Sequence, residues 1–281
     1  MCSSEVPIET KFNELTTSMT QPPFSSNTEV AALDIVYRDD FFIAVNKPSG
    51  LLVHKSEIDK YETQFAMQIL RDQINQWVFP VHRLDKPTSG VLLFALSDTA
   101  ARDIQLTWQE KNVTKTYLAV VRGWLNTATD VDHPLKEILD KYTDKKAKKD
   151  KPPQEAQSLF IPLNNIELEV ANDRFKTSRY SLVKCLPKTG RKHQLRRHLK
   201  HLSHPIIGDA KFGKSLHNRI FSEQLNCNRL LLHAASLEFY HPYTNKSVSI
   251  FAEFDQTMSQ LFEKFQWPSS VSELLNNHYA S

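Results

Sequence analysis

The sequence predicts one mixed domain, of the α/β or α+β class, in which helices flank a central sheet. Residues 91–96 and 115–122 each contain an uninterrupted apolar run of strand length, which is typical of strands buried on both faces. Residues 99–111, between these runs, show helical periodicity with Ile104 and Trp108 four apart. Two central strands separated by a helix indicate a sheet with helices packed on it.

Length and composition narrow the class of protein. The 281 residues suffice for a sizeable core, and 40% hydrophobic with 24% charged residues is typical of a soluble globular protein. No apolar run approaches the roughly 18 residues of a membrane span, and no secretory signal is visible. Cys2, Cys185 and Cys227 are odd in number and far apart, which disfavours a disulfide framework and predicts a cytoplasmic protein.

The first half of the chain predicts four elements before the central strands. Residues 1–28 are polar and without periodicity, so we expect a disordered extension, in which Met19 is an alternative start. Residues 31–37 and 41–46 predict a hairpin, and residues 47–50 a turn that leads into the extended residues 51–54. Residues 63–74 predict a helix.

The remaining elements follow the first central strand. Asp98 is the expected N-cap of the helix over 99–111, and the lysine-rich residues 133–157 predict a solvated insertion. Strands are expected at 158–161 and 180–186, a helix at 192–202, a hairpin at 230–240 and 247–251, and a closing helix at 255–265. No repeat or Gly/Ser linker divides residues 29–281, so we expect a single domain there.

The loop of residues 82–90, His-Arg-Leu-Asp-Lys-Pro-Thr-Ser-Gly, leads directly into the first central strand. Lys86 precedes Pro87 and is therefore disfavoured in a helix. One carboxylate, Asp85, thus lies between Arg83 and Lys86 at the rim of a rigid sheet, where catalytic groups are often found. An ordinary surface ion pair is the alternative interpretation, and the residue types alone leave it open.

A basic stretch runs from residue 188 to residue 219, with nine Lys or Arg against one acid, Asp209. Such a one-sided charge suits a polyanion, nucleic acid first, and a solvated basic face is the alternative. In the helix at 192–202, Leu195, Leu199 and Leu202 predict the core face. Arg196 adjoins that stripe, so it needs an anionic partner, and Asp85 beside it would stay ionised.

Three other chemistries find little support. The histidines at 193, 198, 201 and 204 lack a Cys pair or a carboxylate among them, so we expect them to face RNA or solvent rather than a metal ion. Ser89 near His82 has no nucleophile elbow around it. With six glycines and no phosphate-binding fingerprint, no nucleotide cofactor is expected.

Six segments, in order, resemble the motifs of the RluA family of pseudouridine synthases: residues 45–50 (VNKPSG), 82–93 (HRLDKPTSGVLL), 115–119 (KTYLA), 189–196 (TGRKHQLR), 204–209 (HPIIGD) and 230–234 (LLLHA). They span roughly residues 35 to 255. A single short motif would be weak evidence, whereas six in the same order are strong.

The resemblance implies a fold and a reaction. The fold is a large, mixed, mostly antiparallel, bent sheet flanked by helices and loops. In the reaction, uracil is cut from its ribose, turned and rejoined through C5, without metal or cofactor. Asp85 is implied as the catalytic aspartate, acting on the ribose C1′ or on the uracil ring. Arg196 pairs with it, and Tyr117 stacks on the uracil and takes part in removing the C5 proton.

The resemblance also implies the partner. The chain is most similar to members of the family that modify tRNA at uridine 65, in the T-stem, and it has no S4-like RNA-binding domain before the catalytic domain. A paired base must be flipped out, and Arg83 is implied to fill the vacated stack. Further RNA contacts are expected from His82, Lys188, Arg191, Lys192 and Arg197, with the enzyme a monomer. A ribosomal-RNA member of the family and an RNA-binding or remodelling module with secondary catalysis remain the alternatives.

Overall fold

The computed structural model describes residues 31–54, 62–110, 113–138 and 151–276. All described residues but Ala31 belong to one compact unit, Ala32–Ser281. The expected extension at 1–28 and the lysines within 139–150 lie outside the described residues. Every described helix is too short or too polar to cross a membrane.

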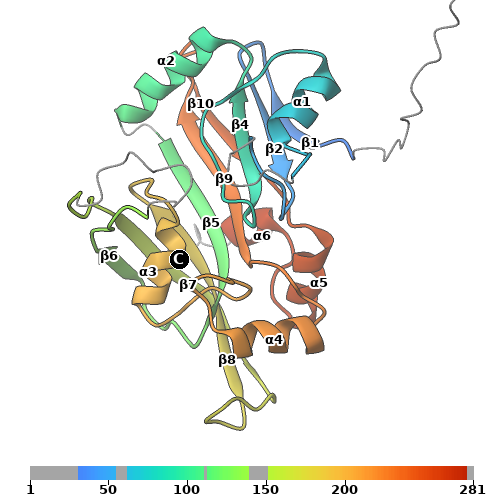
Figure 1. Cartoon of the computed structure of the whole chain (residues 1–281), viewed down its shortest axis with the longest axis vertical. Coiled ribbons are helices and arrows are strands. Elements are labelled where there is room, and N and C mark those ends of the chain that lie inside the picture. Colours follow the sequence, from blue (N-terminus) through green and yellow to red (C-terminus); the bar gives the residue numbers. More distant parts are fainter. Residues whose placement is uncertain (1–30, 55–61, 111–112, 139–150, 277–281) are drawn as a thin grey trace, which may run out of the picture. The chain divides into compact units, whose positions relative to one another are not determined.

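Ten strands of the described residues form one sheet (Figure 1). They are β1 (Asp34–Arg38), β2 (Phe42–Lys47), β3 (Phe79–Pro80), β4 (Ser89–Ala95), β5 (Val113–Arg122), β6 (Thr129–Asp132), β7 (Gln157–Leu168), β8 (Ser178–Pro187), β9 (Leu232–Tyr240) and β10 (Ser247–Phe251). The order is β1-β2-β4-β9-β5-β8-β7-β6, with β3 paired to β4 and β10 to β9. Among these described strands only β4 and β9 pair in parallel, so the mostly antiparallel sheet is confirmed.

The helices are α1 (Ala66–Ile74), α2 (Asp98–Gln109), α3 (Gln194–His201), α4 (Ser215–Gln224), α5 (Gln256–Lys264) and α6 (Val271–Asn276). All four predicted helices are present. The predicted cap of α2 is wrong by one residue, because the Ser97 hydroxyl, not Asp98, accepts the backbone N–H of Ala100.

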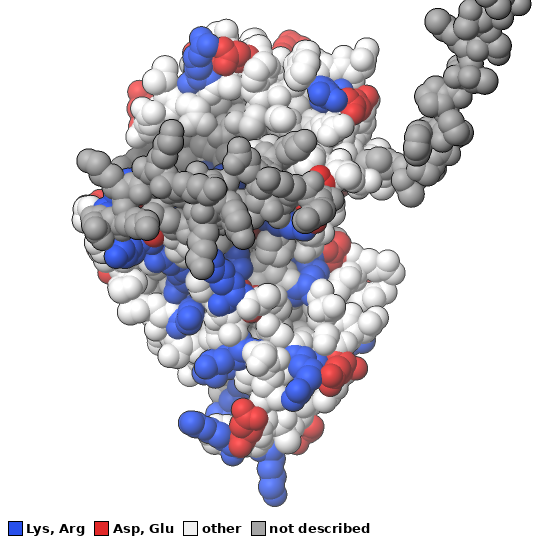
Figure 2. Space-filling view, viewed as in Figure 1, with Lys and Arg blue, Asp and Glu red and all other residues white. Residues whose placement is uncertain are grey.

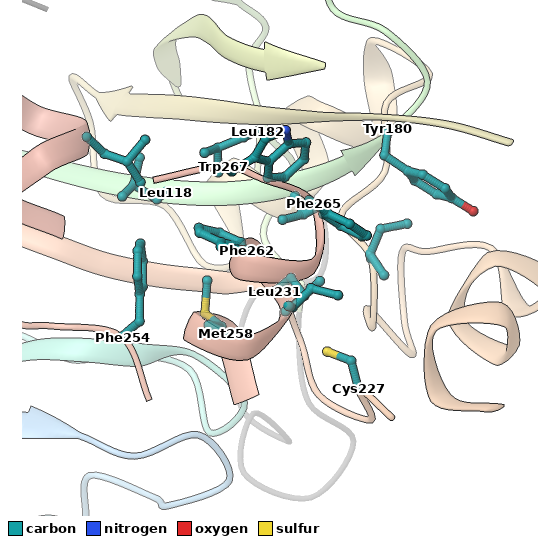
Figure 3. Close-up of a cluster of buried hydrophobic side chains, with 14 of the residues drawn as sticks. Leu118, Tyr180, Leu182, Cys227, Leu231, Phe254, Met258, Phe262, Phe265 and Trp267 are labelled. Carbon is teal, nitrogen blue, oxygen red and sulfur yellow. The ribbon is translucent and has the colours of Figure 1, made fainter. Parts of the chain in front are cut away.

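Alternation along the two central strands sets which helices cover which face. In β5, Leu118 and Val120 pack with α4, α5 and α6 in the largest buried cluster (Figure 3). Ala119 and Val121 point to the opposite face, into the cluster that contains Leu195 and Leu199 of α3. The predicted core face of α3 is therefore confirmed. Leu232 and Ile207, expected in the core, are also buried.

Strand β4 is buried along its whole length, as its apolar run predicts. Leu93 and Ala95 face α2, whereas Leu92 and Phe94 face α1. At its start, Gly90 has a φ of +108°, and a Cβ there would lie 2.2 Å from the carbonyl oxygen of Ala234 on β9. Only glycine allows this close parallel pairing, which fixes where the loop before β4 emerges from the sheet.

The sequence missed or shortened several elements. Strand β6 and helices α4 and α6 were not predicted, and β7 continues to Leu168 instead of ending at residue 161. The segment after residue 161 contains Pro162 and two asparagines, which favour a turn. A register shift between Pro162 and Asn164 accommodates this local preference, and β7 pairs with β8 on both sides of it.

Candidate active site

Asp85 lies in the turn that precedes β4, and its side chain is 26% exposed. The backbone N–H of Thr88 donates to the Asp85 carbonyl at 3.0 Å and closes the turn. Arg83, two residues earlier, is exposed, whereas Leu84 is buried and anchors the loop. The Asp85 carboxylate thus lies at the surface, on a loop that is fixed by the Thr88 hydrogen bond and by the buried Leu84 side chain.

A second loop, after β2, clamps this turn. The buried Lys47 ammonium donates to the carbonyls of Pro48 and Leu51, each at 2.8 Å, and to that of Lys86 at 3.2 Å. The Gly50 amide donates to the Lys86 carbonyl at 2.9 Å, and the Ser49 hydroxyl to the Pro87 carbonyl at 2.8 Å. Burial and the charge of Arg229 lower the pKa of Lys47 to about 7, and Asp85 opposes that shift.

Arg196 of α3 lies between two carboxylates. Its Nη1 is 2.8 Å from Asp85 Oδ2, and its Nε and Nη2 are 2.7 and 2.9 Å from the two oxygens of Asp209. Burial opposes its charge, but the hydrogen bonds that it donates to Asp209 and Asp85 raise the pKa of Arg196. The prediction that Arg196 needs an anionic partner next to the core is confirmed, and it has two such partners, Asp85 and Asp209.

Asp209, like Lys47, is a residue of this site that the sequence analysis missed. It is 2% exposed, and burial works against its charge, yet the hydrogen bond from Arg196 and the backbone amides of Phe212 and Lys211 lower its pKa. One signal was visible, because Asp209 is the one acid within the basic stretch from 188 to 219. It fixes the guanidinium from behind, so that one face remains for Asp85.

Tyr117 lies beside Asp85 at an irregularity of β5. The pairing of β5 with β9 shifts register between Thr116 and Tyr117, and such bulges change the direction of a side chain. Tyr117 is half-buried and packs against two of the hydrophobic clusters. Burial and the nearby charge of Asp85 raise the pKa of its hydroxyl, which therefore stays protonated at neutral pH.

His193 and Phe212 complete the wall around Arg196. His193, in the left-handed region with φ of +57°, starts α3 and places its Nε2 3.7 Å from Asp85 Oδ1. Burial lowers its pKa, so the ring is neutral at pH 7. The Phe212 ring lies 5.2 Å from the Arg196 guanidinium carbon. The structure thus places Asp85, Tyr117 and Arg196, the three predicted catalytic residues, in one group.

Behind the turn, a buried polar chain holds the start of β4. His233 Nε2 donates to the Ala252 carbonyl at 2.8 Å, and its Nδ1 accepts the Ser89 hydroxyl at 2.8 Å. The Ser89 oxygen in turn accepts Arg229 Nη2 at 2.6 Å. Ser89 is 2% exposed, so this Ser–His contact is a structural link and not a nucleophile open to substrate.

The residues predicted to bind RNA are spread more widely. Lys188 pairs with Asp130 of β6, Arg191 donates to the Glu155 carbonyl, and Lys192 to the Ile138 carbonyl, so these three lie near β6 and the described residues 138 and 155. His82 uses its Nε2 inside the protein, where it accepts the Leu93 amide at 3.1 Å. Arg197 is half-buried.

The expectation that the α3 histidines face RNA or solvent is wrong for His198. It is fully buried, with Nδ1 bonded to the Ser158 hydroxyl at 3.1 Å and Nε2 to the His133 carbonyl at 3.0 Å. His201 stacks on His133, and His204 bonds to the Arg122 carbonyl. Among described residues no group of three or more His, Cys, Asp or Glu is arranged to hold a metal ion.

Comparisons with known proteins show which family the chain is similar to. The family model "RNA pseudouridylate synthase" matches residues 41–201, which include Asp85, Tyr117 and Arg196. The chain is 53% identical over 239 residues to tRNA pseudouridine synthase C of Vibrio vulnificus (strain CMCP6), covering 85% of this chain and 98% of that protein. It is 52% identical over 235 residues to tRNA pseudouridine synthase C of Haemophilus influenzae, covering 84% and 98%.

Solved structures agree on the fold. Human RNA Pseudouridylate Synthase Domain Containing 1 is similar with a TM-score of 0.62 and 25% identity over 89% of this chain and 95% of that one. The human Domain Containing 4 protein gives the same TM-score at 24% identity. The ten-stranded sheet of the described residues is therefore a pseudouridine synthase fold. On these matches, the chain belongs to the RNA pseudouridylate synthase family.

Proposed function

We propose that this protein isomerises uridine to pseudouridine in tRNA, at uridine 65 of the T-stem, with Asp85 as the catalytic carboxylate. The observation that carries the proposal is the position of Asp85, partly exposed on a clamped turn and held by a buried arginine. The substrate class is supported by the near-complete overlap with two enzymes named tRNA pseudouridine synthase C.

Asp85 and Arg196 divide the chemistry between them. The N1–C1′ bond breaks, the uracil turns, a C5–C1′ bond forms, and the proton lost from C5 is balanced by one gained at N1. Asp85 acts as the nucleophile on C1′ or on the uracil ring. Arg196 holds that carboxylate in place and cannot itself lose its charge, because Asp209 binds it from the other side.

Tyr117 supports the base once it leaves the helix. Its protonated hydroxyl and half-buried ring suit stacking on the uracil, and a role in removing the C5 proton requires its own proton to move first. Flipping the base costs a few kcal/mol. Arg83 is exposed two residues from Asp85 and is therefore available to fill the vacated stack.

The proposal also covers the domain organisation, the oligomeric state and the cellular compartment of the enzyme. Residues 29–281 form the catalytic domain with its lysine-rich insertion, and the enzyme acts as a monomer in the cytoplasm, where tRNA is modified. The elution volume and scattering mass of the purified full chain test the monomer.

The decisive experiment compares the purified protein with its Asp85→Asn variant on tRNA transcripts, with carbodiimide mapping of pseudouridine. We expect conversion at uridine 65 to fall at least about a thousand-fold in the variant. Asp98→Asn, an exposed carboxylate in an ion pair with Arg102, is the matched control and should keep full activity.

Mapping of tRNA and rRNA from a deletion strain separates the alternatives. Loss of pseudouridine from rRNA with tRNA unchanged would exclude the tRNA substrate in favour of a ribosomal one. If Asp85→Asn abolishes conversion but rescues the strain as well as the wild type does, RNA binding carries the biological role.

A further inference from the structure

A basic surface lies next to the group formed by Asp85, Tyr117 and Arg196. A hollow of about 910 Å³ opens between the loop joining β7 to β8 and the segment that leads into α4. It is lined by Arg122, Gly123, residues 172–175, Thr177, Arg179, Lys200, Ser203, Pro205 and residues 212–217. Figure 2 shows Lys and Arg gathered on the lower half of this face of the molecule, over α3, α4 and the β7–β8 end of the sheet.

The charges that line this hollow are mostly unpaired. Five cations, Arg122, Arg174, Arg179, Lys200 and Lys214, stand against one acid, Asp173. Within the described part of the chain, Arg179 alone of these cations pairs with a carboxylate, that of Glu167 at 3.2 Å. Arg122 donates to a neutral group, the Ser203 carbonyl. Cations without carboxylate partners leave a positive field that a polyanion can neutralise.

The β7–β8 loop presents its side chains from a fixed backbone. Asn172 Oδ1 accepts the amides of Arg174 and Phe175, each at 3.1 Å, and its Nδ2 donates to the Thr177 carbonyl at 2.8 Å. The backbone N–H of Asn172 also donates to the Phe175 carbonyl. Phe175 is nevertheless 68% exposed. A large aromatic ring held in water beside cations is typical of a surface on which nucleobases stack.

The hollow adjoins the proposed catalytic group through Phe212. This ring lines the hollow and also lies against the guanidinium of Arg196, which holds Asp85. Lys200, 5.8 Å from the same ring, belongs to both surfaces as well. An RNA strand that presents a uridine to Asp85 therefore has the hollow next to it.

We propose that this hollow binds the sugar–phosphate backbone of the substrate RNA next to the modified uridine, with Phe175 stacking on a base or ribose of that RNA. The inference rests on the proposed function. A single small anion fits less well, because a hollow of about 910 Å³ is far larger than one phosphate group and five cations line it. Backbone contacts here would add affinity without reading sequence.

The first test removes two unpaired cations, in Arg174→Gln/Lys214→Gln. Binding of a tRNA transcript is measured by fluorescence anisotropy in the Asp85→Asn background, from about 50 to about 300 mM KCl. Each lost phosphate contact lowers the slope of log K against log salt by about 0.7 to 0.9. We expect a slope smaller by between one and two, and roughly tenfold weaker binding near 0.1 M salt.

The matched control removes the same charge elsewhere. Arg38→Gln/Lys246→Gln changes two exposed cations, at the end of β1 and before β10, and should leave the slope and the affinity unchanged. Urea midpoints of both double variants must agree with the parent. Unchanged tRNA affinity and slope in a folded Arg174→Gln/Lys214→Gln protein would overturn the proposal.

Two further measurements sharpen the result. Phe175→Ala should weaken RNA binding roughly fivefold or more with an unchanged salt slope, because stacking releases no counterions. With Asp85 intact, the double cation variant should raise KM for tRNA and leave kcat unchanged. A fall in kcat at saturating tRNA would place the hollow in the chemical step and contradict a purely binding role.

These outcomes separate the hollow from the proposed function. If no uridine in tRNA is converted, yet the cation variants weaken RNA binding with the smaller salt slope, the enzyme assignment fails and the RNA surface stands. If conversion depends on Asp85 but tRNA binding is indifferent to Arg174, Lys214 and Phe175, the surface fails and the enzyme assignment stands.

Discussion

Two ion pairs of the same length involve cations of the predicted basic stretch, residues 188–219. Arg196 Nη1 and Asp85 Oδ2 are 2.8 Å apart, as are Lys188 Nζ and Asp130 Oδ2. The Arg196 side chain is 8% exposed and is held by a second, fully buried carboxylate, whereas Lys188 and Asp130 are 51% and 56% exposed. The distance between the charged atoms therefore does not show which pair contributes more to stability. Burial does, because water screens the second pair more strongly than the first.

The largest expected effect comes from breaking the buried pair. Arg196→Met leaves Asp209 buried without its cation, and it should reduce the free energy of unfolding by about 4 kcal/mol. Urea denaturation at neutral pH measures this. Lys188→Met is the matched change on the exposed pair, and equal losses in the two variants would show that burial does not distinguish them.

A pH titration tests His233, which belongs to the buried polar chain behind the Asp85 turn. Burial, helped by the charge of Arg229 and opposed by the hydrogen bond to Ala252, lowers the pKa of His233 from 6.5 to about 4. As the pH falls, His233 is protonated in the unfolded chain before it is protonated in the folded protein. Neutral His233 therefore costs the fold no stability above pH 6.5, and the free energy of unfolding decreases as the pH falls from 6.5 toward 4. The loss should reach about 3 kcal/mol.

The His233→Asn variant keeps a polar group at this position without a titration in that range. Unfolding free energies of the two proteins, measured between pH 7 and pH 4, should converge as the pH falls. Parallel pH profiles would assign the acid sensitivity of the protein to other groups.

Asp209→Asn should have an intermediate effect, a loss of about 2 kcal/mol in unfolding free energy, because Asp85 still pairs with Arg196 and one oxygen acceptor remains. As a positioning residue, Asp209 should affect kcat for uridine conversion more than KM. A variant with reduced stability but wild-type kcat would limit Asp209 to a structural role.

The smallest expected effect is that of Lys188→Gln. The exposed pair with Asp130 contributes less than about 1 kcal/mol to folding. If Lys188 contacts RNA, the same change should lower the salt slope of tRNA binding by about one. An unchanged slope with unchanged stability would remove Lys188 from the RNA surface.

The comparison also shows which parts of the fold were accessible from sequence. Strands β4 and β5 were predicted because burial on both faces produces continuous apolar runs, and α3 because its leucines recur at helical spacing. Strand β6 and helix α6 are short, and β7 contains Pro162, so their local signals are weak or misleading. They exist because β6 pairs with β7, β7 pairs with β8, and α6 packs with α4 and α5, which are partners that a local window cannot contain.

The candidate site divides in the same way. Asp85 was found from its place between a polar loop and a buried strand, and Arg196 from a charge at the edge of an apolar stripe. Asp209 and Lys47 were missed as site residues, because their role depends on burial and on partners elsewhere in the chain. His198 was assigned to the surface because helical spacing alone could not show that His133 and Ser158 cover it.

The sequence by itself determined the chemistry-bearing residue types, the central strands and the family. Ordered motifs and apolar runs are local properties, which a chain carries before it folds. The tertiary structure decided which charges act together: it joined Asp85 to Arg196 across 111 positions of sequence and buried Asp209 behind them. It also left Arg174 and Lys214 without carboxylate partners among the described residues that surround them. Pairing and burial are long-range properties, and they distinguish the proposed catalytic carboxylate and the proposed RNA surface from ordinary charged residues.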